Sequence, residues 1–248
     1  MQNILITGAS SGLGLFLAKH FDKLNFNLVT VGRDKRKVNN LKNLLSLKNK
    51  SNCFRYDLSV SKDFKNFINK IKSKKFNSVI HCMGGGLGMH ETLIDKKNLS
   101  VLFDINVGIA LNINNEVISK NLKKKNLKLI HIGSVKGLET GASVGYSMVK
   151  ASLIAYTKTL ARKLIKKNIF IHCVLPGAFE YNHNSFERLK KKNKKIYNKF
   201  IKEKLPLQKI SKPNDFIGLF ELLISDKGNI LSGSSITADF TETSTFRI

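Results

Sequence analysis

The sequence predicts a single α/β domain over residues 1–248, with a doubly wound parallel sheet of about seven strands and helices on both faces. Three observations predict it. Short apolar runs alternate with amphipathic segments along the whole chain, which is the order of strands and crossover helices in a parallel sheet. The first apolar run enters a glycine-rich turn directly. A second glycine cluster follows the fourth run, and parallel sheets bind ligands at the carboxyl ends of their strands.

The first strand and its turn lie within residues 4–14. Ile4-Leu5-Ile6 leads into a turn that ends at Gly14, and a helix is predicted over about 13–23. Free N–H groups and the positive end of the helix dipole meet at such a junction, which therefore suits a pyrophosphate. The spacing G-x-x-x-G-x-G is neither G-x-G-x-x-G nor a P-loop, and an ordinary tight turn is the alternative. The residues that we expect to bind cofactor here are Gly8, Ser10, Ser11, Gly12, Leu13 and Gly14.

A second strand is predicted over residues 28–31, and it ends in Gly32-Arg33-Asp34-Lys35-Arg36. In a dinucleotide-binding fold, an acidic residue at this end binds the ribose 2′-hydroxyl of NAD, whereas an arginine accommodates the 2′-phosphate of NADP. Arg33 follows the glycine directly and Asp34 stands one place beyond, so the pattern favours NADP(H), with NAD(H) as the alternative. A solvated basic helix start would give the same pattern.

The next segments are a helix over 37–48, a strand over 53–58 and a helix over 61–73. Asp57 ends this third strand, where its carboxylate can accept a hydrogen bond from an adenine amino group. We therefore expect Asp57 and Leu58 to lie beside the adenine. A turn or N-cap aspartate is the alternative.

The fourth strand, over 78–83, runs into a glycine cluster at 84–88. We expect Gly84 to border the ligand crevice. A long, mostly apolar helix is predicted over 97–122, with Asn106 in its middle. Because buried amides need partners, Asn106 is either a structural hydrogen-bonding group or part of a site.

A fifth strand over 127–134 has Ser134 at its tip. Tyr146 and Lys150 follow at the start of a helix that runs to about 167, and their i, i+4 spacing puts both on one face. A sixth strand over 169–175 ends in Pro176-Gly177.

The last part of the chain contains a lysine-rich segment with a thin apolar stripe at about 178–210, predicted as a mobile helical lid over the substrate. A helix over 213–226 and a final strand over 234–238 follow it.

Together these residues resemble the classical short-chain dehydrogenase/reductase family over essentially the whole chain. Thr7 to Gly14 matches that family's cofactor motif, and Pro176-Gly177 matches its motif after the sixth strand. Four residues fall on its catalytic positions in the right order, namely Asn106, Ser134, Tyr146 and Lys150. The resemblance implies a Rossmann-type fold and an NADP(H)-dependent oxidoreductase that interconverts a carbonyl and a secondary alcohol without a metal. It also implies a homodimer or homotetramer formed through the helices at 97–122 and 144–167.

The resemblance implies a role for each of these residues. Tyr146 would be the general acid/base, and Lys150 would lower its pKa and bind the nicotinamide ribose. Ser134 would hydrogen-bond the substrate oxygen, and Asn106 would hold a proton-relay water. The backbone after Pro176-Gly177 would contact the nicotinamide carboxamide.

Two segments depart from the family's pattern. Cys82-Met83-Gly84 stands where the family usually has Asn-Ala-Gly, which puts the local geometry in question. Asp239-Phe240-Thr241 stands where Asp-Gly-Gly is frequent, and this change affects C-terminal packing or a subunit contact.

The composition limits the remaining function classes. Lys and Arg number 43 against 17 Asp and Glu, a net charge of +26, which would suit nucleic acid or another anionic partner. The lysines are spread over nearly every segment without a recognition motif, so we favour a compositional bias and do not expect nucleic-acid binding. No apolar run approaches the ~18 residues of a membrane span. The three cysteines indicate reduced thiols in a cytoplasmic protein.

The substrate is constrained only by the lid. Its lysines suggest an anionic substrate, such as a 3-oxoacyl thioester on a carrier protein or coenzyme A, or a nucleotide-linked sugar. Two alternatives stay open: an NAD-dependent dehydrogenase of the same family, and a non-catalytic cofactor-binding protein with a regulatory or nucleic-acid-binding role.

Overall fold

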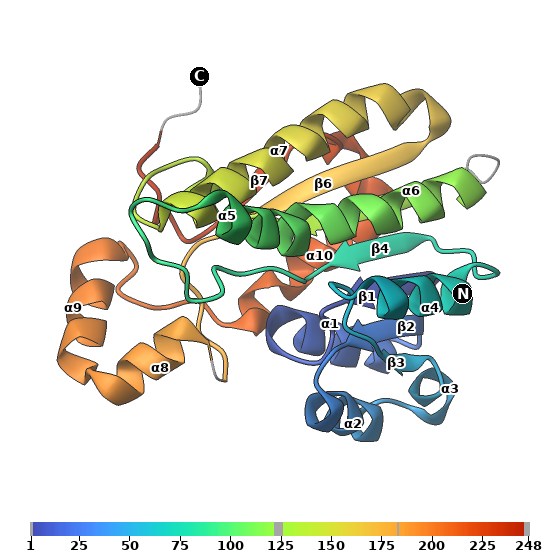
Figure 1. Cartoon of the computed structure of the whole chain (residues 1–248), viewed down its shortest axis with the longest axis horizontal. Helices are drawn as coiled ribbons and strands as arrows, with labels where there is room; N and C mark the ends of the chain where they lie inside the picture. Colours follow the sequence, from blue (N-terminus) through green and yellow to red (C-terminus); the bar gives the residue numbers. More distant parts are fainter. Residues whose placement is uncertain (1, 122–125, 183, 246–248) are drawn as a thin grey trace.

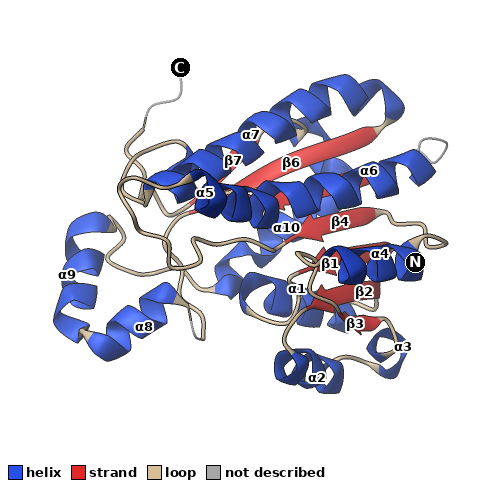
Figure 2. Ribbon diagram, in the orientation of Figure 1, coloured by secondary structure: helices blue, strands red, loops and turns tan. Residues whose placement is uncertain are grey.

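The computed structural model describes residues 2–121, 126–182 and 184–245. Within them, seven parallel strands form one sheet in the order β3-β2-β1-β4-β5-β6-β7, with helices on both faces (Figures 1 and 2). The predicted fold class is thereby confirmed. The ends of the predicted domain, residue 122 of the predicted long helix and residue 183 of the predicted lid lie outside the described residues.

The strands are β1 (Asn3–Thr7), β2 (Asn27–Gly32), β3 (Cys53–Arg55), β4 (Ser78–His81), β5 (Leu127–Ile132), β6 (Ile169–Pro176) and β7 (Ser235–Ala238). The α-helices are α1 (Gly12–Lys23), α2 (Lys35–Leu44), α3 (Leu47–Lys50), α4 (Ser61–Ile71), α5 (Lys96–Phe103), α6 (Ile109–Asn121), α7 (Val144–Leu164), α8 (Ser185–Lys192), α9 (Lys194–Lys204) and α10 (Ile217–Ile224). The short helices are η1 (Asp104–Gly108), η2 (Val135–Gly137), η3 (Ile165–Lys167), η4 (Pro213–Phe216) and η5 (Asp226–Leu231).

The two faces of the sheet bury separate apolar clusters because successive side chains of a strand point to opposite sides. In β1, Ile4 and Ile6 pack with α1, α2 and α10. Leu5 points the other way and packs with α4, α6 and α7. All three side chains are fully buried, so the strand is apolar throughout, as is usual when helices cover both faces of a parallel sheet.

The strand order reverses next to β1, which pairs with β2 on one side and β4 on the other. Thr7, the last residue of β1, lies opposite both Val31 and His81. The loops that follow β1, β2, β4, β5 and β6 therefore meet along one edge of the sheet. This edge is the place where sheets of this type bind ligands.

Two helices, α2 and α3, stand where the sequence predicted one helix over 37–48. The break lies at Leu45, whose backbone is extended, and at Ser46. Asp22 of α1 accepts hydrogen bonds from the Ser46 backbone N–H at 2.9 Å and from its hydroxyl at 2.6 Å. This tertiary contact takes the N–H group that a continuous helix would use.

The predicted helix over 97–122 is continuous but changes type at η1, a π-helical turn between α5 and α6. Asn106 lies in this turn, and its side-chain amide donates to the carbonyl of Leu102 at 2.9 Å. The side chain thus satisfies a carbonyl at the widened turn. Single π-helical turns of this kind are frequent at functional sites.

Two helices, α8 and α9, occupy the segment that the sequence predicts as a lid, and they project from one side of the molecule (Figure 1). They are tied to the body through Glu180, whose carboxylate is 7% exposed. It accepts hydrogen bonds from Lys212 at 2.8 Å and from the Tyr197 hydroxyl at 2.7 Å. Burial opposes the charge of Glu180, but these bonds hold the pKa of its carboxyl below the ordinary value.

Candidate active site

The glycine-rich turn connects β1 to α1 with its backbone closely packed. Gly8 has φ +66°, and a Cβ on it would lie 2.9 Å from the backbone of Cys82. A Cβ on Gly14 would lie 2.5 Å from the carbonyl oxygen of Gly8. Neither position tolerates a larger residue, so the N–H groups at the start of α1 stay accessible. Leu13 is buried in the core and acts here through its backbone.

A cavity of about 670 Å³ lies beside this turn and is lined by Ser10, Ser11 and Gly12. Its other walls come from α1, α2, η4 and the lid. Arg36 and Lys37 at the start of α2 line it, whereas Arg33 does not. Arg33 is exposed at the end of β2, one turn before these two residues. The cations that face this cavity are therefore Arg36 and Lys37, whereas the sequence pattern favoured Arg33.

Tyr181 also lines the cavity, and its ring lies on the glycine-rich turn. A Cβ on Gly12 would be 2.8 Å from that ring. Burial raises the pKa of Tyr181, and the nearby Tyr146 raises it further. Tyr181 therefore stands between the cavity and Tyr146, a position that the sequence did not predict.

Asp57 and Leu58 lie in the turn after β3, because that strand ends at Arg55 and not at 58 as predicted. One oxygen of Asp57 accepts hydrogen bonds from the backbone N–H and the hydroxyl of Ser59, at 3.1 and 2.6 Å. Leu58 is buried in the core. Asp57 is thus a turn aspartate that keeps its second oxygen for another partner.

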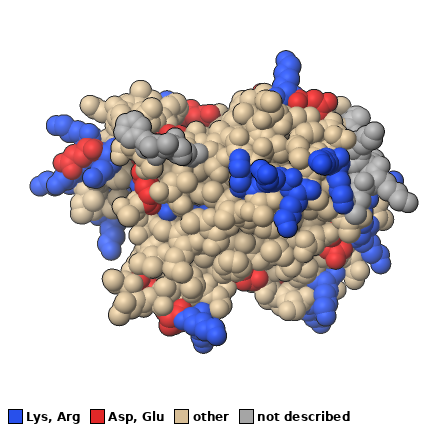
Figure 3. All heavy atoms as spheres, turned by 90° about the horizontal axis from the view of Figure 1, so that it is seen from above, with Lys and Arg blue, Asp and Glu red and all other residues tan. Residues whose placement is uncertain are grey.

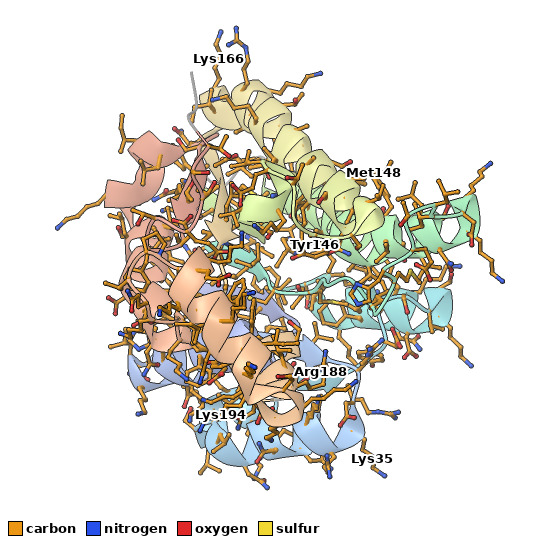
Figure 4. All side chains as sticks on the ribbon, turned by 90° about the vertical axis from the view of Figure 1, so that its left-hand side faces the viewer. Lys35, Tyr146, Met148, Lys166, Arg188 and Lys194 are labelled. Atoms are coloured by element: carbon orange, nitrogen blue, oxygen red, sulfur yellow. The ribbon has the colours of Figure 1, made fainter. Side chains whose placement is uncertain are left out.

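Three of the predicted catalytic residues meet at the edge of the sheet. Ser134 follows β5, and its hydroxyl accepts a hydrogen bond from the Lys136 N–H at 3.2 Å and lies close enough to the Tyr146 phenol to lower its pKa. The Lys150 ammonium lies 5.6 Å from the centre of the Tyr146 ring. In Figure 4, Tyr146 lies at the end of α7 that faces the lid helices. Burial raises the pKa of the Tyr146 phenol, and Ser134 opposes that rise.

The Lys150 side chain is only 3% exposed. Its ammonium donates to the carbonyl oxygen of Ile132 in β5 at 2.9 Å. Burial lowers the pKa of Lys150 to about 8, while Cys173 and Cys82 act in the opposite direction. The group therefore still carries its charge at neutral pH but loses it more readily than an exposed lysine.

The fourth predicted residue, Asn106, holds the second glycine cluster in place. Its carbonyl oxygen accepts from the Gly85 N–H and its amide donates to the Gly85 carbonyl, both at 3.0 Å. A Cβ on Gly84 would lie 2.6 Å from Asn106 Oδ1 and 3.1 Å from Lys150 Nζ. The cluster therefore packs against Asn106 and Lys150. Both amide hydrogens of Asn106 are thus used, by the carbonyls of Gly85 and Leu102.

Pro176 ends β6, and the Gly177 N–H donates to the Ala238 carbonyl at 3.2 Å. The C-terminal segment closes over this point, because Glu242 accepts a hydrogen bond from the Ala178 N–H. Asp239 also packs on Gly177. The segment at 239–242, which includes the residues that depart from the family's pattern, thus contacts the loop after β6.

The segment Cys82-Met83-Gly84 keeps the ordinary backbone pairing at its start, since the Cys82 N–H donates to the Thr7 carbonyl at 3.1 Å. Burial raises the pKa of the Cys82 thiol to about 12, so it stays protonated. Met83 packs in the apolar core. This segment supplies no strong hydrogen-bonding side chain at the end of β4.

Sequence reasoning missed two contributors to the site: Tyr181 and the cavity-facing role of Arg36 and Lys37. The basic cluster after β2 was visible in the sequence, but the residue that faces the cavity depends on where α2 begins. Tyr181 had a weaker signal, as an aromatic residue shortly after Pro176-Gly177.

The face of the molecule shown in Figure 3 carries no single basic patch. On this face, Lys and Arg form separate groups between uncharged areas. Among the residues that the structure describes, no helix combines the length and apolar composition needed to cross a membrane. No group of three His, Cys, Asp or Glu within the same residues is arranged to hold a metal.

Comparison with known families and sequences gives a consistent result. A family profile described as short chain dehydrogenase matches residues 2–192. The 3-oxoacyl-(acyl-carrier-protein) reductase FabG of Rickettsia felis is 26% identical over 239 residues, covering 94% of this chain and 92% of that protein. The protein of the same name from Rickettsia prowazekii is 27% identical over 235 residues, with the same coverage.

Solved structures share the fold. YwfH, an NADPH-dependent reductase involved in bacilysin biosynthesis, has a TM-score of 0.88 at 21% identity and covers 99% of both chains. The L-sorbose reductase of Gluconobacter frateurii, complexed with NADPH and L-sorbose, has a TM-score of 0.86 at 21% identity and covers 99% of this chain and 97% of that one.

Proposed function

Since the chain belongs to the short-chain dehydrogenase/reductase family and is therefore an NAD(P)-dependent oxidoreductase acting on CH–OH and C=O groups, we propose that it reduces a carbonyl with NADPH at Tyr146. The observation that carries this proposal is the meeting of Ser134, Tyr146 and Lys150 at the ligand-binding edge of the sheet. A panel of ketones assayed with NADPH and NADH tests it.

The residues present suit a dinucleotide. Glycines at positions 8, 12 and 14 carry no side chain, so the backbone at the start of α1 can approach a pyrophosphate closely. Lys150 and Tyr146 would hold the nicotinamide ribose, and the backbone after Pro176-Gly177 the carboxamide. Asp57 and Leu58 would lie beside the adenine, and Gly84 would border the crevice that holds the cofactor. When bound, the cofactor supplies the hydride.

The protein's own residues would manage the proton. A phenol with an ordinary pKa of ~10 holds its proton at neutral pH, so Tyr146 can give it to the oxygen of a reduced carbonyl. Ser134 would donate to the same oxygen and align it. The Lys150 ammonium would stabilise the phenolate that remains, because an opposite charge favours the ionised form.

The preference for NADPH is assigned to the cations at the start of α2. Arg36→Ala is expected to weaken NADPH binding about tenfold and leave NADH binding unchanged, because a lost charge-assisted hydrogen bond is worth ~1.5 kcal/mol. Titration of nicotinamide fluorescence measures both affinities. Arg33→Ala is the matched variant, since Arg33 is exposed and does not line the cavity. If Arg33→Ala alone weakens NADPH binding and leaves NADH binding unchanged, Arg33 and not Arg36 contacts the 2′-phosphate.

The substrate is proposed to be anionic, such as a 3-oxoacyl thioester or a nucleotide-linked sugar. Glu187 of α8 lines the cavity, and α8 and the adjoining α9 carry their lysines on exposed positions. A positive surface beside a site attracts anions and raises their local concentration. The FabG relatives carry names that specify an acyl-carrier-protein substrate.

A charge reversal on the lid tests this substrate class. Lys194→Glu is expected to raise the KM for acetoacetyl-CoA about threefold and leave the KM for uncharged ethyl acetoacetate unchanged. Lys166→Glu is the matched control, because Lys166 is equally exposed but lies far from the lid in Figure 4. Steady-state kinetics at low and high NaCl measure the effect. Equal changes in both lysine variants would argue against a directed field.

A homodimer or homotetramer is proposed through the outer face of α5 and α7. These helices pack side by side through Leu102 and Val149. Apolar side chains remain exposed on them, at 42% for Phe103 and 46% for Met148. Contiguous exposed apolar patches mark protein interfaces, and these side chains are the candidates for one. Sedimentation equilibrium of the purified 27.9 kDa chain tests the assembly.

A further inference from the structure

A chain of buried polar side chains connects the sheet to α6 and α7 below the candidate active site. His81 ends β4, and His131 lies opposite it in β5 with the ring centres 5.3 Å apart. Asn114 of α6 binds both imidazoles, and Thr157 of α7 binds His131 on its other side. Each of the four side chains is at most 4% exposed.

The donor and acceptor of each hydrogen bond follow from Thr157, which stands at one end of this series of polar side chains. The Thr157 hydroxyl donates to the Leu153 carbonyl at 2.8 Å, so it accepts from His131 Nδ1 at 2.7 Å. His131 is therefore protonated on Nδ1 and accepts on Nε2 from the Asn114 amide at 2.9 Å. The Asn114 carbonyl oxygen then accepts from His81 Nε2 at 2.8 Å.

This order of donors and acceptors requires a neutral His131, and burial lowers the pKa of His81 to about 4, so His81 is neutral at pH 7 as well. The opposite orientation of Asn114 would need a doubly protonated His131 at a site without solvent exposure, which is costly. Burial and the neighbouring His81 and His172 hold the pKa of His131 well below its ordinary value. The second hydrogen of the Asn114 amide points to the Tyr156 hydroxyl oxygen at 3.2 Å, and this bond lowers the pKa of Tyr156 against the effect of burial.

These buried polar side chains lie two helical turns from the candidate catalytic residues. Lys150 and Thr157 are seven residues apart on the same face of α7, or about 10 Å along its axis. Asn106 and Asn114 stand in a similar relation along η1 and α6. Lys150 itself donates to the carbonyl of Ile132, the residue that follows His131. The same two helices and the same strand end thus carry both sets of residues.

We propose that His81, Asn114, His131 and Thr157 form a positioning network that fixes α6 and α7 against the ends of β4 and β5. Apolar packing is not directional, whereas hydrogen bonds of one defined order select a single arrangement of the helices on the sheet. The network acts on catalysis through the backbone, by setting where Tyr146 and Lys150 stand. Its kinetic consequences rest on the proposed function.

Substitutions at Thr157 test the network. Thr157→Val keeps the shape of the side chain and leaves the His131 Nδ1–H without an acceptor. We expect kcat to fall about tenfold with little change in KM, because small displacements of catalytic groups are costly. The titration of Tyr146, followed by NMR of tyrosines labelled with ¹³C at Cζ, is expected to move to higher pH. Thr157→Ser keeps the hydroxyl and is expected to retain both properties.

Two more variants make the result specific. Thr30→Val is the same substitution at a buried position of β2, outside the network, and is expected to leave kcat unchanged. Tyr156→Phe removes the acceptor of the second Asn114 hydrogen and is expected to lower kcat about threefold, since an unsatisfied amide costs less than a broken chain. If Thr157→Val does not fold, the kcat of Tyr156→Phe tests the positioning network in its place.

Three results would overturn the proposal: wild-type kcat and Tyr146 titration in folded Thr157→Val, equal losses in the Ser and Val variants, or an equal loss in Thr30→Val. The titration of Tyr146 needs no substrate. If the wild-type protein reduces no carbonyl but the Tyr146 titration still moves in Thr157→Val, the proposed function fails and the positioning network stands.

Discussion

Replacement of Tyr146 by phenylalanine is expected to lower kcat for carbonyl reduction about a thousandfold, because a positioned general acid contributes ~10²–10⁴ to the rate. The ring would remain beside the Lys150 ammonium, which lies 5.6 Å from its centre. Only the hydroxyl that lies close to Ser134 would be lost. NADPH absorbance under single-turnover conditions measures the step itself, so slow product release does not mask the loss.

The binding of NADPH is expected to change less than about twofold in Tyr146→Phe, since the substitution removes one of many contacts. The chain has no tryptophan, so enhancement of nicotinamide fluorescence reports binding without tryptophan emission. Tyr56→Phe is the matched control for turnover, because the Tyr56 ring packs against Phe54 and Phe67 on the other side of β1 from Ser134 and Lys150 in the strand order. Undiminished turnover in Tyr146→Phe would remove the proton donor from the proposed mechanism.

The free energy of unfolding is expected to fall as the pH drops from about 6.5 to about 4, because of buried neutral histidines. Burial lowers the pKa of His81 to about 4 and that of His172 to about 4. An unfolded chain binds a proton on each below its ordinary pKa of ~6.5, while the folded chain does not until about pH 4. The contribution of these histidines to the free energy of unfolding is therefore fully present above about pH 6.5 and is lost between about pH 6.5 and about pH 4. Each histidine accounts for about 2 kcal/mol at pH 5.

Urea unfolding at pH 7 and pH 5 measures this loss. His172→Gln is expected to remove its own share, so the variant should lose about 2 kcal/mol less than the wild type between the two pH values. His90→Gln is the control, since His90 is exposed on the loop after β4. An identical pH dependence in the wild type and in His172→Gln would mean that His172 does not contribute through its titration.

Most of the fold could be predicted because its signals are local. The apolar runs that form β1, β4, β5 and β6 are bounded by turns, and the glycine spacing after β1 is set by the close approach of Gly14 to Gly8. The i, i+4 spacing of Tyr146 and Lys150 likewise needs no tertiary information. Each of these features depends only on a short stretch of sequence.

The parts that could not be predicted depend on contacts between distant segments. The break between α2 and α3 follows from Asp22, which lies in another helix. The engagement of Asn106 follows from Gly85, 21 residues away. Periodicity describes one segment at a time, so it cannot reveal which side chains of two segments will meet. The three strand histidines were visible as polar residues in apolar runs, but their partners were not.

The strand order also has a consequence for how the chain reaches its folded state. β1 pairs with β4, which brings Ile4 beside Ser78, and parallel pairings between distant segments form slowly. All four strands around the glycine-rich turn lie before residue 82, whereas Tyr146 is synthesised much later. On a ribosome, these four strands therefore emerge before α6, α7 and α10, the helices that complete the two apolar clusters of the sheet. The sheet can thus bury both of its faces only after most of the chain has been synthesised.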